Sequence, residues 1–310
     1  MTELSYLQAV VIGLLQGATE LFPVSSLGHS VLVPALFGGS WQHLVTEAAS
    51  GNSEGSPYLA FIVALHVATA FALLWFFRTD WVRIICGFFR TLATRRVQTS
   101  EERLAWIILV ATIPVGLTGL LLEHTFRTLF AKPLVAAVFL TINGGILLLG
   151  ERLRRASDDR GAAEPTSVAD QGGRGVVVAE HRTLDRLAYR EAGIIGLFQT
   201  LALFAGISRS GITMVAGLLR GLDHEDAARL SFLLATPVIL AAGVLKLPTL
   251  AGPAGAPIHG QVVVGMVVAG AAAYLSVKYL VRYFETRTLR PFAIYCLFAG
   301  ALCTLRFALG

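Results

Sequence analysis

Residues 16–30 decide how this chain folds, and they read QGATELFPVSSLGHS. The stretch holds the carboxylate of Glu20, a proline, the adjacent hydroxyls of Ser25 and Ser26 and the imidazole of His29, between apolar segments. An ionisable group at membrane depth costs about 2.5–3.5 kcal/mol on insertion scales, so it is a functional-site hypothesis by default. The polar side chains of this stretch therefore predict a functional site.

A second stretch repeats the first: residues 199–211 read QTLALFAGISRSG. At a constant offset, its first Gln, its first Ser and its last Gly fall under the equivalents in residues 16–28, and the preceding Gly-Leu pairs also match. The second copy carries different polar groups, which belong to Ser208, Arg209, Ser210 and, just beyond, Thr213. The chain thus looks duplicated, with a polar stretch in each half.

The composition is that of an integral membrane protein. Of 310 residues, 55% are hydrophobic and 15% are charged, whereas about a quarter of a soluble domain is charged. The net charge of +5 does not indicate nucleic-acid binding, because the basic residues lie in short loops between apolar segments. Cys86, Cys296 and Cys303 lack metal-ligand spacing and predict packed thiols.

Six apolar runs are long enough to span the hydrocarbon core, which takes about 20 residues. They occupy residues 58–77, 104–122, 134–150, 227–247, 261–281 and 292–309. The two polar stretches differ from these runs, because Pro23 and Gly206 interrupt their apolar segments. Matching interruptions in two halves indicate discontinuous helices around a midplane site, so each stretch is expected to form a re-entrant helical hairpin.

Charge orients this arrangement. Arginines concentrate near residues 78–103, 151–186 and 282–290, whereas residues 38–57 contain no Lys or Arg. Since cytoplasmic loops carry the excess of Lys and Arg, the first hairpin enters from outside and the second from inside, with three spans after each. We expect an all-α polytopic membrane protein built as an inverted repeat. Its parts are residues 1–150 (hairpin 4–37), a mobile cytoplasmic linker at 151–185, and residues 186–310 (hairpin 186–219).

The second stretch has the features of a phosphate site. Residues 206–211 place hydroxyls, free backbone N–H groups and the positive end of a half-helix around Arg209, whose guanidinium matches phosphate oxygens. Arg209 could instead be an interfacial anchor, but its place at the expected hairpin tip favours a ligand. The residues expected to bind phosphate are Arg209, Ser208, Ser210, Gly211 and Thr213.

The first stretch offers a nucleophile. His29 follows Ser26 by three residues, hence on the same helical face, and a hydroxyl within reach of an imidazole can be activated for attack. Alternatively, Ser25 and Ser26 only cap the half-helix, and His29 bonds a neighbouring helix. Glu20, one turn after Gln16, could orient His29 or bind a divalent cation, Mg²⁺ or Ca²⁺, together with substrate oxygens.

Other polar residues of the apolar segments receive less weight. His66 and Thr69 could face the same cavity, but a lone His in an apolar helix is more often a packing residue. Asn143, beside two glycines, is expected to serve close helix packing. Residues 81–94 mix arginines with apolar residues and predict an amphipathic helix at the interface.

Taken together, the motifs resemble the undecaprenyl pyrophosphate phosphatase family, also called the bacitracin resistance protein family. They read QxxxE at 16–20, PVSSxGH at 23–29 and GxSRSxxT at 206–213, and the similarity extends over nearly the whole chain. The resemblance implies a multi-pass enzyme of the bacterial cytoplasmic (inner) membrane. On the outer face, it would hydrolyse undecaprenyl pyrophosphate to undecaprenyl phosphate and inorganic phosphate with a divalent cation, recycling the lipid carrier of peptidoglycan synthesis and conferring bacitracin resistance.

The same resemblance implies the role of individual residues. It assigns the acidic pair to Gln16 and Glu20, the motif serine to Ser26, the histidine to His29 and the phosphate-binding arginine to Arg209. The chain departs from the family at Gln16, where many members have Glu, which weakens a two-carboxylate metal site. It also has Ala205 in place of the usual Pro, which should loosen the second break.

Two functions of different classes fit these features. In a lipid pyrophosphatase, Ser26 assisted by His29 and Glu20 would attack the terminal phosphorus, or help water to do so, while the remaining site residues, Gln16 and Ser25 among them, bind the substrate. Inverted repeats with broken helices are also transporter architecture, so a flippase that moves a polyprenyl phosphate without hydrolysis is the alternative. The expected partners are the lipid substrate, membrane lipids and a second copy of the chain in a homodimer.

Overall fold

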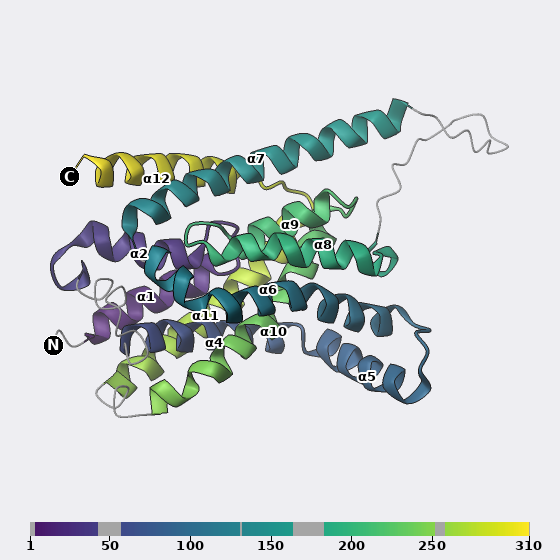
Figure 1. The fold of residues 1–310 in the computed structure, drawn as a ribbon, viewed down its shortest axis with the longest axis horizontal. Helices are drawn as coiled ribbons and strands as arrows, with labels where there is room; N and C mark the ends of the chain where they lie inside the picture. The colour runs from purple at the N-terminus through teal and green to yellow at the C-terminus, as the bar shows by residue number, and fades with distance from the viewer. Residues whose placement is uncertain (1–3, 43–56, 131, 164–182, 252–257, 310) are drawn as a thin grey trace.

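Long helices that lie roughly side by side make up the fold (Figure 1). The computed structural model describes residues 4–42, 57–130, 132–163, 183–251 and 258–309, and this part of the chain contains no strand. The first half contains α1 (Tyr6–Thr19), α2 (Ser26–Phe37), α4 (Pro57–Phe76), α5 (Arg78–Thr94), α6 (Ser100–Phe130) and α7 (Pro133–Ala163). The second contains α8 (Tyr189–Thr200), α9 (Arg209–Leu218), α10 (His224–Ala251), α11 (His259–Phe284) and α12 (Arg290–Ala308), with short 3-10 turns at Leu184–Arg186 and Leu201–Leu203.

Five of the expected spans are confirmed among the described residues. Helices α6, α7, α10, α11 and α12 each contain a segment long and apolar enough to cross a membrane. The sixth expected span, residues 58–77, is α4, which passes the same test jointly with α5, although the pair is bent by 86°. The predicted amphipathic helix is α5, whose Phe89 is exposed while Ile84 is buried.

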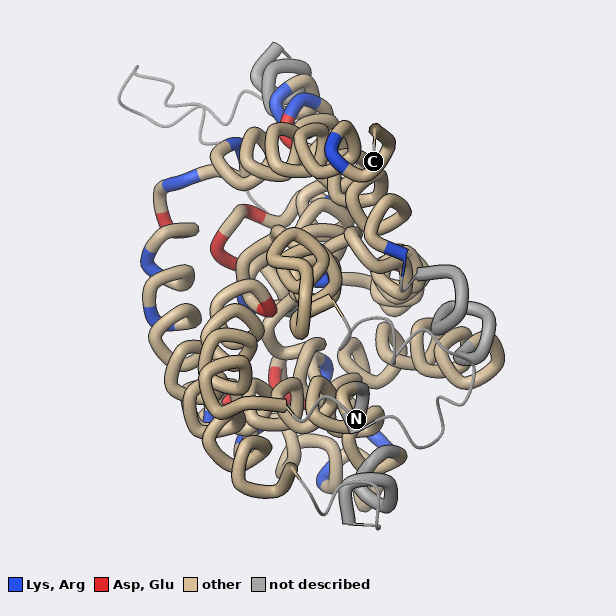
Figure 2. Tube along the Cα trace, turned by 90° about the vertical axis from the view of Figure 1, so that its left-hand side faces the viewer, with Lys and Arg blue, Asp and Glu red and all other residues tan. Residues whose placement is uncertain are grey.

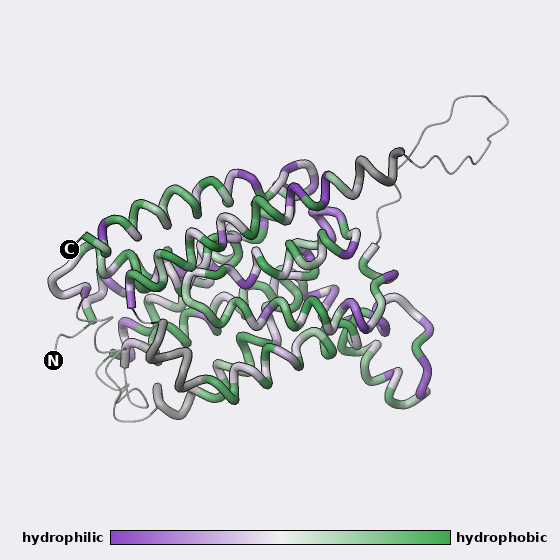
Figure 3. Tube along the Cα trace, turned by 45° about the horizontal axis from the view of Figure 1, so that its top comes forward, coloured by the Kyte–Doolittle hydropathy of each residue, from purple (hydrophilic) through white to green (hydrophobic). Residues whose placement is uncertain are grey.

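Uncharged residues dominate the body of the bundle. Figure 2, which looks along the helices, shows long uncharged stretches in every layer. Hydrophilic residues concentrate toward the end of the bundle where α5 and the far end of α7 lie (Figure 3). This is the distribution that a bilayer requires, because hydrocarbon cannot solvate charged side chains.

Both polar stretches are broken helices, as the sequence predicts. The first break runs from Glu20 to Ser25, between α1 and α2, and the second lies between the 3-10 turn at Leu201–Leu203 and α9. Gly206 in the second break has φ +111°, a conformation that favours glycine, and Ser25 in the first has φ +69°. Such a conformation in a non-glycine residue persists only where the surroundings hold it, and it is frequent at functional sites.

The helix before each break packs against a helix from the other half of the chain. Helix α1 lies along α11, with Gly17 against the backbone of Ala269, and α8 lies along α6, with Gly196 against the backbone of Ala111. A Cβ at either glycine would overlap the facing carbonyl oxygen. Small residues let membrane helices approach closely, and here the approach brings both breaks into the interior.

The first part of the linker expected at residues 151–185 is helical, because α7 continues to Ala163. Glu151 is buried and accepts hydrogen bonds from His224 Nε2 and from the backbone N–H of Leu289, both at 2.7 Å. These contacts with α10 and with the start of α12 keep the helix intact past the apolar segment. Residues 164–182 of the expected linker lie outside the described residues.

Candidate active site

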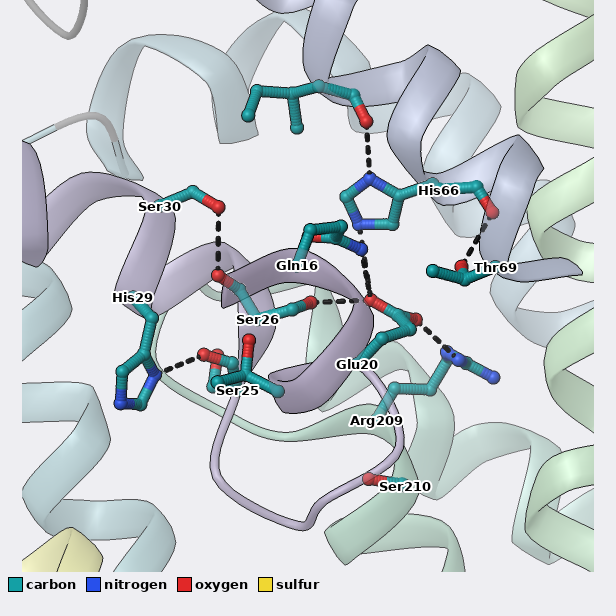
Figure 4. A network of polar contacts seen from close by, with 12 residues as sticks. Gln16, Glu20, Ser25, Ser26, His29, Ser30, His66, Thr69, Arg209 and Ser210 are labelled. Atoms are coloured by element: carbon teal, nitrogen blue, oxygen red, sulfur yellow. Dashed lines mark hydrogen bonds and ion pairs between the residues drawn. The ribbon is translucent and has the colours of Figure 1, made fainter. Parts of the chain in front are cut away.

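The two breaks meet inside the bundle and bring Glu20 against Arg209 (Figure 4). Arg209 Nη2 donates to Glu20 Oε1 at 2.6 Å. A second contact joins the same segments, since Ser210 Oγ donates to the carbonyl oxygen of Phe22 at 3.2 Å. The prediction that the two stretches come together is therefore confirmed.

Glu20 lies at the centre of the polar contacts. Its Oε2 accepts from Ser26 Oγ at 2.5 Å and from Gln16 Nε2 at 2.9 Å, and it lies 3.3 Å from His66 Nε2. The residue is only 6% exposed. A buried carboxylate is costly unless it is paired and hydrogen-bonded, and here two basic side chains, one hydroxyl and one amide surround it. The resulting arrangement is a buried anion that holds a hydroxyl group close to an arginine.

The expected pairing of Ser26 with His29 is not formed in this structure. Ser26 donates to Glu20, while His29 Nδ1 contacts the carbonyl oxygen of Ser25 and His29 Nε2 contacts the hydroxyl of Tyr295, each at 2.7 Å. Because a carbonyl only accepts, Nδ1 carries the hydrogen, and in the neutral ring Nε2 then accepts from the Tyr295 hydroxyl.

The cause is local geometry. Ser26 opens α2 and its side chain turns back to the break, whereas the His29 ring turns to the carbonyl four residues earlier. His29 therefore points away from Glu20 (Figure 4), which also excludes the expected contact between those two side chains here. The group placed to accept the Ser26 proton is Glu20.

His66 belongs to the same cluster, although its sequence context favours a packing role. Its Nδ1 contacts the carbonyl oxygen of Ile62 at 2.8 Å, and its Nε2 faces Glu20. A carbonyl and a carboxylate both accept, so this placement suits an imidazole that donates from both nitrogens. Thr69 is close by, but its hydroxyl donates to the carbonyl oxygen of His66 at 2.6 Å. What points to His66 in the sequence is the energetic cost of an ionisable side chain in an otherwise apolar span.

The chain matches the family model described as "Bacitracin resistance protein BacA" over residues 9–302. It belongs to the BacA family. Undecaprenyl-diphosphatase 2 of Frankia alni is 69% identical, with 100% of both chains covered. The undecaprenyl-diphosphatase of Mycolicibacterium paratuberculosis is 58% identical over 99% of this chain and 98% of the relative. Undecaprenyl-diphosphatase 2 of Burkholderia thailandensis is 44% identical over 95% and 94%.

Family membership and the apolar helices together make this chain a multi-pass membrane protein. In the site of this BacA-family protein, the hydroxyls of the second stretch already make hydrogen bonds to other groups of the chain. Ser208 Oγ caps α9, and Ser210 reaches the first break. Thr213 Oγ1 donates to the carbonyl oxygen of Arg209 at 2.7 Å. The backbone N–H of Gly211 donates to the capping Ser208. As phosphate ligands, these residues would have to exchange their present bonds.

Two buried polar atoms of the site keep free hydrogen-bonding capacity. Arg209 Nη1 and Gln16 Oε1 have no partner in the described structure, although both are buried. An unpaired buried polar group costs about 1–3 kcal/mol, so each such group calls for an explanation. An anion that accepts a hydrogen bond from Arg209 Nη1 would satisfy the first atom, and a hydrogen-bond donor or a cation that binds Gln16 Oε1 would satisfy the second. The site is thus suited to an anion, alone or together with a cation.

Proposed function

We propose that this chain is an undecaprenyl-diphosphatase, which hydrolyses undecaprenyl pyrophosphate to undecaprenyl phosphate and inorganic phosphate. The names of the relatives and the full-length match to the BacA family support this function. The observation that carries it is the unpaired Nη1 of Arg209, whose Nη2 binds the same Glu20 carboxylate that accepts from the Ser26 hydroxyl. The product is the lipid carrier of peptidoglycan synthesis, and its recycling would confer the bacitracin resistance for which the family is named.

The geometry supports attack by Ser26. As its Oγ bonds to the terminal phosphorus, its proton passes to Glu20 Oε2, which lies 2.5 Å away. The bond from that phosphorus to the bridging oxygen breaks, and undecaprenyl phosphate leaves. Water then attacks the phosphorus of the phosphoserine, the bond from phosphorus to Ser26 Oγ breaks, Glu20 returns the proton to that Oγ, and inorganic phosphate is released. Phosphoryl transfer depends mainly on positioning and charge stabilisation, which Arg209 supplies through its free Nη1 and His66 supports from the other side of Glu20.

A divalent cation, Mg²⁺ or Ca²⁺, is part of the proposal. The described residues contain no cluster of three or more His, Cys, Asp and Glu side chains that could hold one. The unpaired Gln16 Oε1 beside Glu20 fits a cation that takes its remaining ligands from substrate oxygens, as Mg²⁺ commonly does. Gln16 would hold the ion together with Glu20, which would have to exchange one of its present contacts, and the ion would neutralise charge on the pyrophosphate.

The finer topology also belongs to the proposal: an inverted repeat in the cytoplasmic membrane, with the site open to the outside. Equivalent elements of the two halves pack in equivalent ways, which supports it. Helix α1 lies on α11 and α8 on α6, while α4 pairs with α10 and α7 with α12. A homodimer stays a prediction.

Phosphate release from the purified protein in detergent tests the function. We expect one inorganic phosphate per undecaprenyl pyrophosphate and none from undecaprenyl phosphate. Excess EDTA should stop release, and added Mg²⁺ or Ca²⁺ should restore it. The flippase alternative, which the relatives' names do not support, predicts no release under any condition. Release that EDTA does not affect would show that hydrolysis needs no divalent cation, and it would leave the proposed hydrolysis itself unchanged.

A further inference from the structure

We propose that Asn143 is a positioning residue that fixes the two breaks relative to each other. Asn143 lies on α7 and is completely buried. Its Nδ2 donates to the carbonyl oxygen of Pro23 at 3.1 Å, and its Oδ1 accepts from the backbone N–H of Ser208 at 3.0 Å. One side-chain amide thus joins the first break to the second. Nothing in the motifs of the sequence assigns it this role.

The bonds satisfy backbone groups that broken helices leave open. Pro23 lies between α1 and α2, and Ser208 is the residue just before α9, so neither group has a partner within its own helix. An unsatisfied backbone group costs several kcal/mol in a membrane. Asn carries both a donor and an acceptor on one planar group and can satisfy two such groups at once. Its Nδ2 also donates to Cys296 Sγ at 3.3 Å.

The two anchored positions adjoin the reacting groups. Ser208 directly precedes Arg209, and Pro23 lies between Glu20 and Ser26. Arg209 holds Glu20 through Nη2 and would take a phosphate oxygen on its free Nη1, so the guanidinium gains a new contact when substrate binds. The bonds of Asn143 go only to backbone and to a thiol, and they need not change. The amide can therefore hold the distance between nucleophile and guanidinium while substrate binds.

The close packing predicted for this part of α7 is carried by the neighbouring residue instead. A Cβ at Gly144 would lie 2.7 Å from the backbone nitrogen of Leu297 on α12. Asn143, expected in the sequence to serve packing, has the separate role of bridging the breaks. This difference makes a polar-to-apolar change at Asn143 an informative test, since Leu has the same branching and number of side-chain heavy atoms and the change leaves Gly144 untouched.

The variant is Asn143→Leu, which has a similar size and no hydrogen bonds. The matched control is Thr141→Val on the same helix, because the Thr141 hydroxyl donates only within α7, to the carbonyl oxygen of Ala137 at 3.0 Å. A misplacement of about 1 Å in a reacting site costs roughly 100-fold. We expect kcat of Asn143→Leu to fall about 10-fold to 100-fold with little change in KM, and Thr141→Val to match the wild type.

The measurement is phosphate release per folded protein, with folding checked by monodisperse elution in detergent. Asn143→Asp keeps the oxygen that accepts from Ser208 and should lose less kcat than Asn143→Leu. Wild-type kcat in folded Asn143→Leu would overturn the inference, as would equal losses in Thr141→Val. If Asn143→Leu does not fold, Asn143→Asp decides, and an unchanged kcat there overturns it. The inference rests on the proposed hydrolysis, but a wild type that releases no phosphate would contradict that function and not the bridging role.

Discussion

Replacing Arg209 by lysine separates charge from geometry at the phosphate site. The guanidinium uses Nη2 to bind Glu20 at 2.6 Å and keeps the buried Nη1 without a partner. It can therefore hold the carboxylate and a phosphate oxygen at the same time. The ammonium of Arg209→Lys is a single point on a flexible stem and cannot reproduce that fork.

The magnitude of the effect follows from the hydrogen bond that lysine cannot make. The variant keeps the positive charge but loses one charge-assisted hydrogen bond, either to Glu20 or to the phosphate. Removing one preorganised donor to developing charge costs about 100-fold to 1,000-fold in kcat, which is roughly 2.7–4 kcal/mol. We expect Arg209→Lys to lose activity in this range although its net charge is unchanged.

The assay is phosphate release from undecaprenyl pyrophosphate at saturating substrate. A matched control exists in Arg229→Lys, because Arg229 Nη2 also binds a carboxylate, that of Asp80 at 2.5 Å, away from the site. We expect the control to keep wild-type kcat. A near-wild-type rate in Arg209→Lys would refute the assignment of Arg209 to phosphate and leave it as a partner of Glu20 only.

Two further predictions concern topology and the second break. In a Cys86→Ala background, which removes the exposed native thiol, Ser40→Cys should react with an impermeant thiol reagent added to intact cells and Arg96→Cys should not; the reverse pattern would contradict the orientation drawn from charge. Gly206→Ala should lower the melting temperature, because residue 206 has φ +111° and its Cβ would overlap the carbonyl oxygen of Ala136. Forcing such backbone costs about 1–3 kcal/mol, so an unchanged melting temperature would count against this geometry.

The sequence was informative where the physics is local or repeated. The breaks at Pro23 and Gly206, the apolar spans and the meeting of the two polar stretches all follow from composition and from the duplication. Apolar runs have a fixed length requirement, and polar groups in such surroundings need partners. These constraints act on any chain of this pattern, so they could be read without a structure.

Side-chain pairing could not be predicted in the same way. Ser26 and His29 have helical spacing, yet the direction of each side chain depends on the break before α2, and the acceptor that Ser26 finds is Glu20. His66 and Asn143 reach the site from α4 and α7, far from both motifs in sequence. Only the packing of those helices shows which of several buried polar residues face the breaks.

The proposed mechanism makes Glu20 the acid–base partner of Ser26, and a double-mutant cycle measures whether the two side chains act together. The first cycle uses Ser26→Ala, Glu20→Gln and the double variant. The comparison cycle uses Ser26→Ala, His29→Ala and their double variant. Residues that act as one unit show strongly non-additive losses, whereas independent sites add.

The measured quantity is kcat for phosphate release by folded protein in each arm. We predict that adding Ser26→Ala to Glu20→Gln costs little beyond Glu20→Gln alone, because the hydroxyl without its acceptor no longer reacts. The losses of Ser26→Ala and His29→Ala should be closer to additive in free energy, since His29 bonds Ser25 and Tyr295 instead. Additive losses for Ser26 with Glu20, together with non-additive losses for Ser26 with His29, would contradict the account and restore the histidine as the base.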